Sequence, residues 1–225
     1  MSVHRPVEVT CPRCEATGNY TMWESINRDL DPAAASELAH GRLLLHRCAG
    51  CGAETPVVYP LLLNAMLERE MVQLADEDGP APDLGPAAAV LRALGDWVLW
   101  MVSSPDALME CARLFEAGLD RFAMLLLHEG LSRELERDGQ RQVEAMLFDS
   151  MDTRMDAPRL VFAVFFAGSE GPEWVTFGHA EWEQHAGLVG PFRARCIPAG
   201  QWTPWSRATA VAALALISAD ATDSP

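Results

Sequence analysis

Hydrophobic and polar positions near the start of the chain follow the two-residue period of β-strands. Val7–Thr10 alternates apolar and polar residues, and Tyr20–Trp23 does the same, so we expect two half-buried strands that pair with each other. Arg42–Arg47 and Thr55–Tyr59 predict two further strands. The first part of the chain is therefore expected to be a small β module.

A short helix is expected inside this β module. Asp31 can cap the N-terminus of a helix, and Pro32 suits the first helical position. Ala33–His40 continues the helix, and Gly41 is where it is expected to end.

Apolar residues at helical spacing follow this module. A helix over Leu61–Leu74 is expected from Leu62, Met66, Leu67 and Met71, which lie near one face. A second helix is expected over Ala87–Met101, with Trp97 and Trp100 in the core. A third helical run begins at Ser104-Pro105-Asp106 and extends to about Met151, with Gly130 and Gly139 as candidate interruptions. Its segment Ser132–Glu144 is expected to face solvent.

The last third of the chain contains segments with the period of strands and segments with the period of helices. Leu160–Phe166 is rich in β-branched and aromatic residues and predicts a buried strand, with Trp174–Phe177 as its hairpin partner. Phe192–Ile197 predicts a weaker strand, and a final helix is expected from Thr203-Pro204 through Ile217.

These patterns predict an α+β fold. An N-terminal zinc-ribbon-like β module with an inserted short helix is followed by a helical and mixed α/β C-terminal part. The expected boundaries are residues 1–75 for the module, 76–86 for a charged Pro- and Gly-containing linker, 87–220 for the C-terminal domain and 221–225 for a flexible tail.

Composition narrows the possible functions. The chain has 225 residues, 49% of them hydrophobic, which is ordinary for a folded protein. Its formal net charge is -15, and all 17 basic side chains are Arg. Because nucleic acids and anionic membranes attract positive charge, this balance argues against both as general partners. A basic protein partner or a small molecule fits better.

The six cysteines are unevenly distributed. Four of them form two Cys-x-x-Cys pairs, Cys11 with Cys14 and Cys48 with Cys51, with 33 residues between the pairs. Two thiolates in one tight turn can reach one ion, and two such turns complete a tetrahedron. A four-thiolate set without an open position favours structural Zn²⁺. Iron in the same cage, a dithiol redox pair and unligated core cysteines are the alternatives.

The spacing of several motifs resembles the bacterial CpXC domain over about residues 7–75. The motifs that carry the resemblance are Cys11-Pro12-x-Cys14, Ser25-Ile26-Asn27, Asp31-Pro32, Leu38, Gly41, Cys48-x-x-Cys51-Gly52 and Tyr59-Pro60-Leu61. That family has no assigned activity, so the resemblance implies a metal site and leaves the function open. For Ser25-Ile26-Asn27 we expect an Asx- or Ser-turn, with a binding loop as the alternative.

One other polar cluster deserves a hypothesis. His179, Glu181, Glu183 and His185 lie within seven residues and could ligate a metal or act as acid and base. Their spacing matches no motif with a known mechanism, so a polar surface segment is the favoured interpretation.

The remaining candidates are interpreted as structural. His128-Glu129 is expected to lie at a helix end, where it would interact with the helix dipole. Cys111 and Cys196 are expected to be small core residues, Cys196 within a strand. Trp202 and Trp205 are expected to cover the edge of the core, with a partner anchor as the alternative.

The leading hypothesis is a cytoplasmic, zinc-stabilised binding or scaffolding protein with an acidic surface and no catalytic residues. No signal-like apolar stretch occurs in Met1–Thr10, and the longest apolar segments are too short to span a bilayer. An enzyme with a site around His179 and Glu183 is the first alternative. A nucleic-acid-binding zinc ribbon that uses Arg13, Arg42 and Arg47 is the second.

Overall fold

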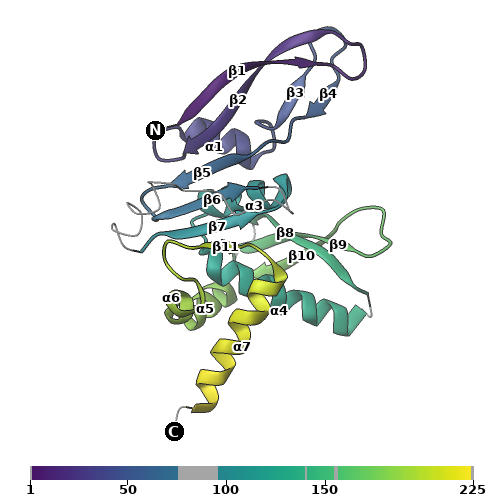
Figure 1. Cartoon of the computed structure of the whole chain (residues 1–225). Helices are drawn as coiled ribbons and strands as arrows, with labels where there is room; N and C mark the ends of the chain where they lie inside the picture. The colour runs from purple at the N-terminus through teal and green to yellow at the C-terminus, as the bar shows by residue number, and fades with distance from the viewer. Residues whose placement is uncertain (1, 76–95, 140, 155–156, 224–225) are drawn as a thin grey trace. The chain divides into compact units, whose positions relative to one another are not determined.

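The computed structural model describes residues 2–75, 96–139, 141–154 and 157–223, and the fold is α+β as predicted (Figure 1). The chain divides into two compact units, residues 1–112 and 113–225. The predicted linker at 76–86 lies outside the described residues, as do residues 87–95 and 224–225.

A β-sheet organises the first unit. β1 (Val3–Thr10) pairs antiparallel with β2 (Thr17–Asn27), and Val7 lies opposite Tyr20. The end of β2 pairs in parallel with β5 (Leu61–Ala65), which forms an antiparallel hairpin with β6 (Glu70–Leu74). β7 (Val98–Val102) then pairs in parallel with β6. The first predicted strand pair is therefore confirmed.

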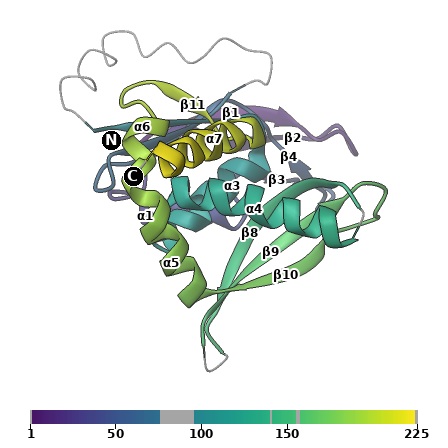
Figure 2. The same ribbon diagram turned by 90° about the horizontal axis from the view of Figure 1, so that it is seen from below.

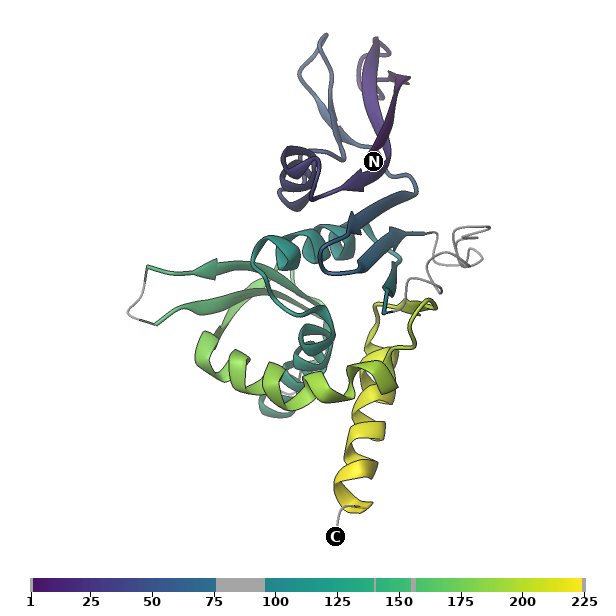
Figure 3. The same ribbon diagram turned by 90° about the vertical axis from the view of Figure 1, so that its left-hand side faces the viewer.

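A second, smaller ribbon belongs to the same unit. β3 (Leu45–Arg47) and β4 (Glu54–Pro56) form a two-stranded antiparallel hairpin, shorter than the predicted strands at these positions (Figure 3). α1 (Pro32–Ala39) packs against β2 and places Leu38 and Ala39 in the core.

The inserted helix is confirmed, with Asp31 at its N-cap position and Pro32 in its first turn, but the Asp31 side chain does not cap it. Asp31 makes no side-chain hydrogen bond to the helix, and its carboxylate instead accepts a hydrogen bond from the Ser2 hydroxyl. The helix end is as expected, because Gly41 adopts a φ of 73°, which glycine reaches without strain.

The predicted helix over Leu61–Leu74 is wrong, because these residues form the β5–β6 hairpin. Burial alternates along both strands, and the buried residues are Leu61, Leu63, Ala65, Glu70, Val72 and Leu74. Met66 and Leu67, which the helix would have buried, occupy the turn. The Asp29 carboxylate accepts hydrogen bonds from the Met66 and Leu67 amides at 2.7 and 3.2 Å. A residue distant in sequence thus stabilises the turn.

The predicted helix over Ala87–Met101 is also wrong where it can be checked. Val98–Met101 belongs to β7, and Trp97 and Trp100 are buried as expected. Successive residues of β7 are buried on both faces, so the strand is almost continuously apolar and has no alternation. The Trp100 indole N–H donates to the buried Glu70 carboxylate at 3.2 Å.

α3 (Pro105–Glu116) starts where predicted and runs across the boundary between the units. In the second unit, α4 (Arg121–Gly139) lies along a three-stranded antiparallel sheet (Figure 2). That sheet has the order β10-β9-β8, and its strands are β8 (Val143–Asp152), β9 (Arg159–Phe166) and β10 (Glu173–Gly178). The β9–β10 hairpin confirms the prediction for this region.

The helical run does not continue to Met151. It ends at Gly139, and the next residues form β8, whose buried Val143, Met146 and Phe148 belong to the core of the sheet. Gly130 does not interrupt α4. Pairing with β9 outweighs the ambiguous local pattern of this segment.

The end of the chain is more helical than predicted. α5 (His179–Val189) is followed by a 3₁₀ turn (Gly190–Phe192) and α6 (Arg193–Cys196), so the strand expected over Phe192–Ile197 is wrong. α7 (Arg207–Asp223) begins after Thr203-Pro204, which lie in the short strand β11 (Trp202–Pro204). None of the helices among the described residues has the length and apolar character needed to cross a bilayer.

Candidate metal centre

The two Cys-x-x-Cys pairs lie at the tips of the two hairpins of the first unit. Cys11 and Cys14 connect β1 to β2, and Cys48 and Cys51 connect β3 to β4. The four Sγ atoms lie within 4.8 Å of one another and can hold one metal ion. Segments 33 residues apart in sequence thus bring together every ligand that the sequence predicted.

The first knuckle is a turn closed by two backbone hydrogen bonds. The Cys11 amide donates to the Ala16 carbonyl at 2.9 Å, and the Glu15 amide donates to the Cys11 carbonyl at 2.9 Å. Glu15 follows the second cysteine and adopts a left-handed φ of 59°. This turn points both thiols of the pair to the same side.

The second knuckle repeats this construction. The Cys48 amide donates to the Ala53 carbonyl at 2.8 Å, and the Gly52 amide donates to the Cys48 carbonyl at 2.9 Å. Gly52 follows the second cysteine and has a φ of 70°. The two knuckles are therefore equivalent in their hydrogen bonds and in the left-handed residue that ends each pair.

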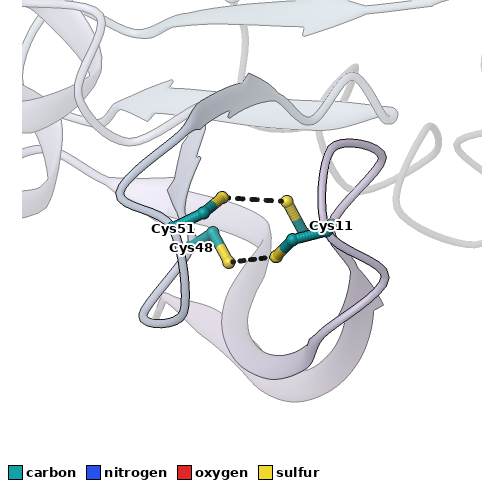
Figure 4. Close-up of side chains that lie close together, drawn as sticks. Cys11, Cys48 and Cys51 are labelled. Atoms are coloured by element: carbon teal, nitrogen blue, oxygen red, sulfur yellow. Dashed lines mark hydrogen bonds between the residues drawn. The ribbon is translucent and has the colours of Figure 1, made fainter.

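Each sulfur lies beside a sulfur of the other knuckle (Figure 4). Sγ of Cys11 is 3.7 Å from Sγ of Cys51, and Sγ of Cys14 is 3.6 Å from Sγ of Cys48. Zn–S bonds of about 2.3 Å in a regular tetrahedron require sulfurs about 3.8 Å apart. The donor set and its spacing thus fit a tetrahedral four-thiolate site.

The pKa values of Cys48 and Cys14 are shifted in opposite directions. Hydrogen bonds from the backbone amides of Cys51 and Gly50 lower the pKa of Cys48 to about 6, which favours its thiolate. For Cys14, the Ala16 amide lowers the pKa, but the thiols of Cys51 and Cys48 oppose it and raise the value to about 12. A metal ion replaces this thiol–thiol contact, because each ligand binds as a thiolate.

A polar bridge that the sequence did not predict joins the hairpins away from the cysteines. The Tyr20 hydroxyl donates to the Leu43 carbonyl at 2.7 Å and lies 3.2 Å from the Tyr59 hydroxyl. The Tyr59 oxygen also accepts the Trp23 amide at 3.3 Å. Burial raises the pKa of Tyr20, as does its contact with Tyr59, so this hydroxyl stays protonated. In the sequence, Tyr20 and Tyr59 belong to two different predicted strands, and nothing in either strand indicates that their hydroxyls meet.

Ser25-Ile26-Asn27 is the end of β2, where it pairs with β5, and a turn begins at Asn27. The Asn27 side-chain oxygen accepts the amides of Asp29 and Leu30 at 3.0 and 3.3 Å. This is the Asx-turn expected from the sequence, and it leads the chain towards α1.

The polar cluster in α5 does not converge. His179 and Glu183 lie one turn apart with 3.9 Å between Nδ1 and Oε1, as expected for one helical face. His185 points elsewhere, and its Nε2 lies 2.9 Å from the Ala123 carbonyl. Among the described residues, the four cysteines are the sole group of three or more potential ligands that converges on one point.

The other candidate residues fall in different places. His128 is half-buried and Glu129 is buried in the middle of α4, so the expectation of a helix end is wrong. Cys111 is a core residue as expected. Cys196 lies in α6 and is partly exposed, so the strand and core expectation for it is wrong.

One of the three arginines named for nucleic-acid binding is paired with a carboxylate. Arg42 forms two hydrogen bonds with the Glu37 carboxylate, at 2.9 and 2.8 Å. This contact neutralises one of the three charges that such a site would need.

Comparison with known families found one match. The model of the CpXC protein family matches residues 9–128, which is more than half of the chain and extends beyond the resemblance noted in the sequence. The comparisons with curated proteins and with solved structures found no match. The matched region includes both knuckles, β5 to β7 and α3. This chain therefore belongs to the CpXC protein family.

Proposed function

We propose that the four cysteines hold one Zn²⁺ ion in a closed structural site and that the protein acts as a binding or scaffolding protein. The observation that carries the metal is the spacing of the sulfurs, 3.6 and 3.7 Å between the knuckles. Zinc suits this donor set because it is redox-inert and takes four thiolates without geometric strain.

The closed donor set supports a structural rather than a catalytic metal. A catalytic zinc keeps one position for water or substrate, whereas four thiolates fill the coordination sphere. No His, Asp or Glu of the described residues joins the cysteine group as a further ligand. His179 and Glu183 lie together, but His185 contacts the Ala123 carbonyl instead, so the cluster gives the enzyme alternative no converging site.

The acidic composition supports a binding role. A net charge of -15 favours encounters with basic partners, because opposite charge speeds association. We place the protein in the cytoplasm, where reduced thiols remain free to bind metal.

The test is the metal content of purified protein and of two cysteine variants. We expect one zinc per chain in the wild type, and X-ray absorption should show four sulfur neighbours at about 2.3 Å. Cys14→Ser should lose zinc and unfold the two hairpins. Cys196→Ser, which removes a cysteine outside the cluster, should keep both.

Iron in the native protein, disulfides between the knuckles, or an oxygen ligand on the metal would each contradict the proposal. Unchanged zinc content in Cys14→Ser would contradict the assignment of the ligands.

A further inference from the structure

A groove lies beside the hairpins of the first unit, on the side of α1. It has a volume of about 620 Å³, within the range of roughly 300–1,000 Å³ typical of ligand pockets. Its lining comes from β2, from the start of α1 and from the segment that leads into β3. The lining residues are Tyr20, Thr21, Trp23, Leu30, Asp31, Pro32, Ala33, Ala34, Glu37, Arg42, Leu43 and Leu45.

The groove brings several apolar side chains together on the surface. Leu30 is 65% exposed and Leu45 is 38% exposed, and both belong to the groove. Trp23 adds a half-buried aromatic ring, whose centroid lies 4.6 Å from that of the His4 ring at a tilt of 51°. Exposed leucines and a tryptophan around one hollow are typical of a surface that a partner covers.

The groove is open rather than enclosed. Sites for small molecules bury most of the ligand, commonly about 70–90% of its surface. Here the leucines at the groove remain accessible, so a small ligand would stay largely in water. A segment of polypeptide that lies across the groove would cover Leu30 and Leu45 together.

The charges at the groove favour a basic segment. Asp31 and Glu37 contribute two carboxylates, and Arg42 contributes one guanidinium that is already paired with Glu37. The local balance is therefore negative, as is that of the whole chain at -15. A segment with Lys or Arg next to apolar side chains would complement both the carboxylates and the leucines that line the groove.

The groove depends on the hairpins that carry the cysteines. The Tyr20 hydroxyl holds the Leu43 carbonyl at 2.7 Å, and Leu43 and Leu45 precede Cys48 along the same segment. An ion that fixes Cys48 relative to the first knuckle would also limit the movement of Leu43 and Leu45, which line the groove.

We propose that this groove binds an extended segment of a partner protein in which apolar side chains alternate with Lys or Arg. The proposal rests on the binding role proposed above and names the surface that performs it. It also makes the metal site a support for this surface.

The experiment uses three blocked seven-residue peptides as probes, titrated into the zinc-loaded full chain. One alternates Leu with Lys, one alternates Leu with Glu, and one alternates Ser with Lys. We expect saturable binding of the Leu/Lys peptide and at least about tenfold weaker binding of the other two. Shifts of amide resonances in β2, α1 and residues 42–45 should accompany binding.

Two matched leucine variants locate the site. Leu30→Ser should weaken binding of the Leu/Lys peptide at least about tenfold. Leu67→Ser should leave it unchanged, because Leu67 is even more exposed, at 84%, but lies in the β5–β6 turn outside the groove. Both substitutions remove an exposed side chain and should leave folding intact.

Three results would overturn the groove proposal. The first is no binding of the Leu/Lys peptide at concentrations up to about 1 mM. The second is an equal loss of affinity for this peptide in Leu30→Ser and Leu67→Ser. The third is a Ser/Lys peptide that binds as tightly as the Leu/Lys peptide. The zinc content is measured on the same samples. One zinc per chain without peptide binding would refute the groove and leave the structural zinc site standing, whereas absent zinc would refute the site itself.

Discussion

At the residue scale, the two knuckles differ in the residue that follows the second cysteine. Glu15 and Gly52 occupy equivalent places and have φ angles of 59° and 70°. A side chain in this left-handed region costs about 1–2 kcal/mol because Cβ approaches the carbonyl oxygen, and glycine avoids that cost. The first knuckle therefore carries strain that the second does not.

We expect Glu15→Gly to raise the free energy of unfolding of the zinc-loaded protein by about 0.5–1 kcal/mol. Gly52→Ala should lower it by about 1 kcal/mol through backbone strain alone, because a Cβ at Gly52 meets no atom within 4 Å. Urea unfolding measures both values.

Gly130→Ala is the control for glycine replacement itself. Gly130 lies within α4, and a Cβ there meets nothing within 4 Å, so this substitution should stabilise by about 1 kcal/mol. Equal signs for Gly52→Ala and Gly130→Ala would contradict the strain at the knuckle.

His128 makes stability depend on pH. The residue is half-buried, but the Nε2 atom of its ring is buried, and the ring centroids of Phe162 and Trp205 lie 5.7 and 6.4 Å from its own. Burial lowers the pKa of His128 to about 4 from the ordinary 6.5. Between these values the unfolded chain binds a proton that the folded chain does not, so stability falls as the pH drops from 6.5 to 4.

The expected loss across this window is about 3 kcal/mol. A glutamine at position 128 cannot be protonated. The free energy of unfolding of His128→Gln should therefore fall by about 3 kcal/mol less than that of the wild type between pH 6.5 and 4. His40→Gln, at an exposed site, should behave like the wild type. Parallel pH profiles of urea unfolding for wild type and His128→Gln would rule out the effect.

At the element scale, an ion-pair network joins α4 to α7. The buried Glu129 carboxylate lies 2.7 Å from Arg207 Nε and also pairs with Arg133. Arg207 further forms two hydrogen bonds with Glu136, which, with a hydrogen bond from the Val143 amide, lower the Glu136 pKa to about 2. One guanidinium thus compensates a buried and a half-exposed carboxylate.

Arg207→Met should lower the free energy of unfolding by about 3 kcal/mol, because it leaves Glu129 buried with less compensation. Arg154→Met is the matched control. Arg154 is 88% exposed and pairs with Asp152 at 2.9 Å, so its loss should cost less than about 1 kcal/mol. Similar losses in the two variants, measured by urea unfolding, would show that burial of Glu129 carries no penalty.

The β5–β6 hairpin shows that a local apolar pattern does not always distinguish a helix from a strand pair. Leu61–Leu74 contains apolar residues at both helical and alternating positions, so the period alone does not choose between them. Pairing with β2 and β7 and the Asp29 hydrogen bonds at the turn choose the hairpin. These partners lie more than twenty residues away, beyond the reach of a pattern read within one segment.

At the scale of the whole molecule, the metal is expected to support only part of the fold. β3 and β4 have three residues each, too few to form a stable hairpin alone. A structural zinc ion contributes on the order of 10 kcal/mol in small modules. The second unit has its own core around Phe148 of β8 and Phe162 of β9, and neither strand carries a cysteine of the cluster.

Chelation should therefore increase amide hydrogen exchange at least about tenfold in β1 to β4, and leave α4, β8 and β9 protected. Exchange measured by mass spectrometry on the full chain, with and without chelator, resolves the two units. Restoring zinc should restore protection. Uniform loss across both units would mean that the metal supports the whole fold.

The sequence by itself determined the cluster of four cysteines, the first hairpin, the inserted helix and the strand pair after Leu160. In each of these, the signal is local: cysteine spacing, Pro32 and Gly41 at the helix ends, or a clear alternation. Tertiary structure decided the β5–β6 hairpin, the strands β7 and β8, the burial of Glu129 within α4 and the bridge from Tyr20 to Tyr59. Those outcomes depend on partners distant in the chain, because sheet pairing, burial and hydrogen bonds between segments exist only once the chain has folded.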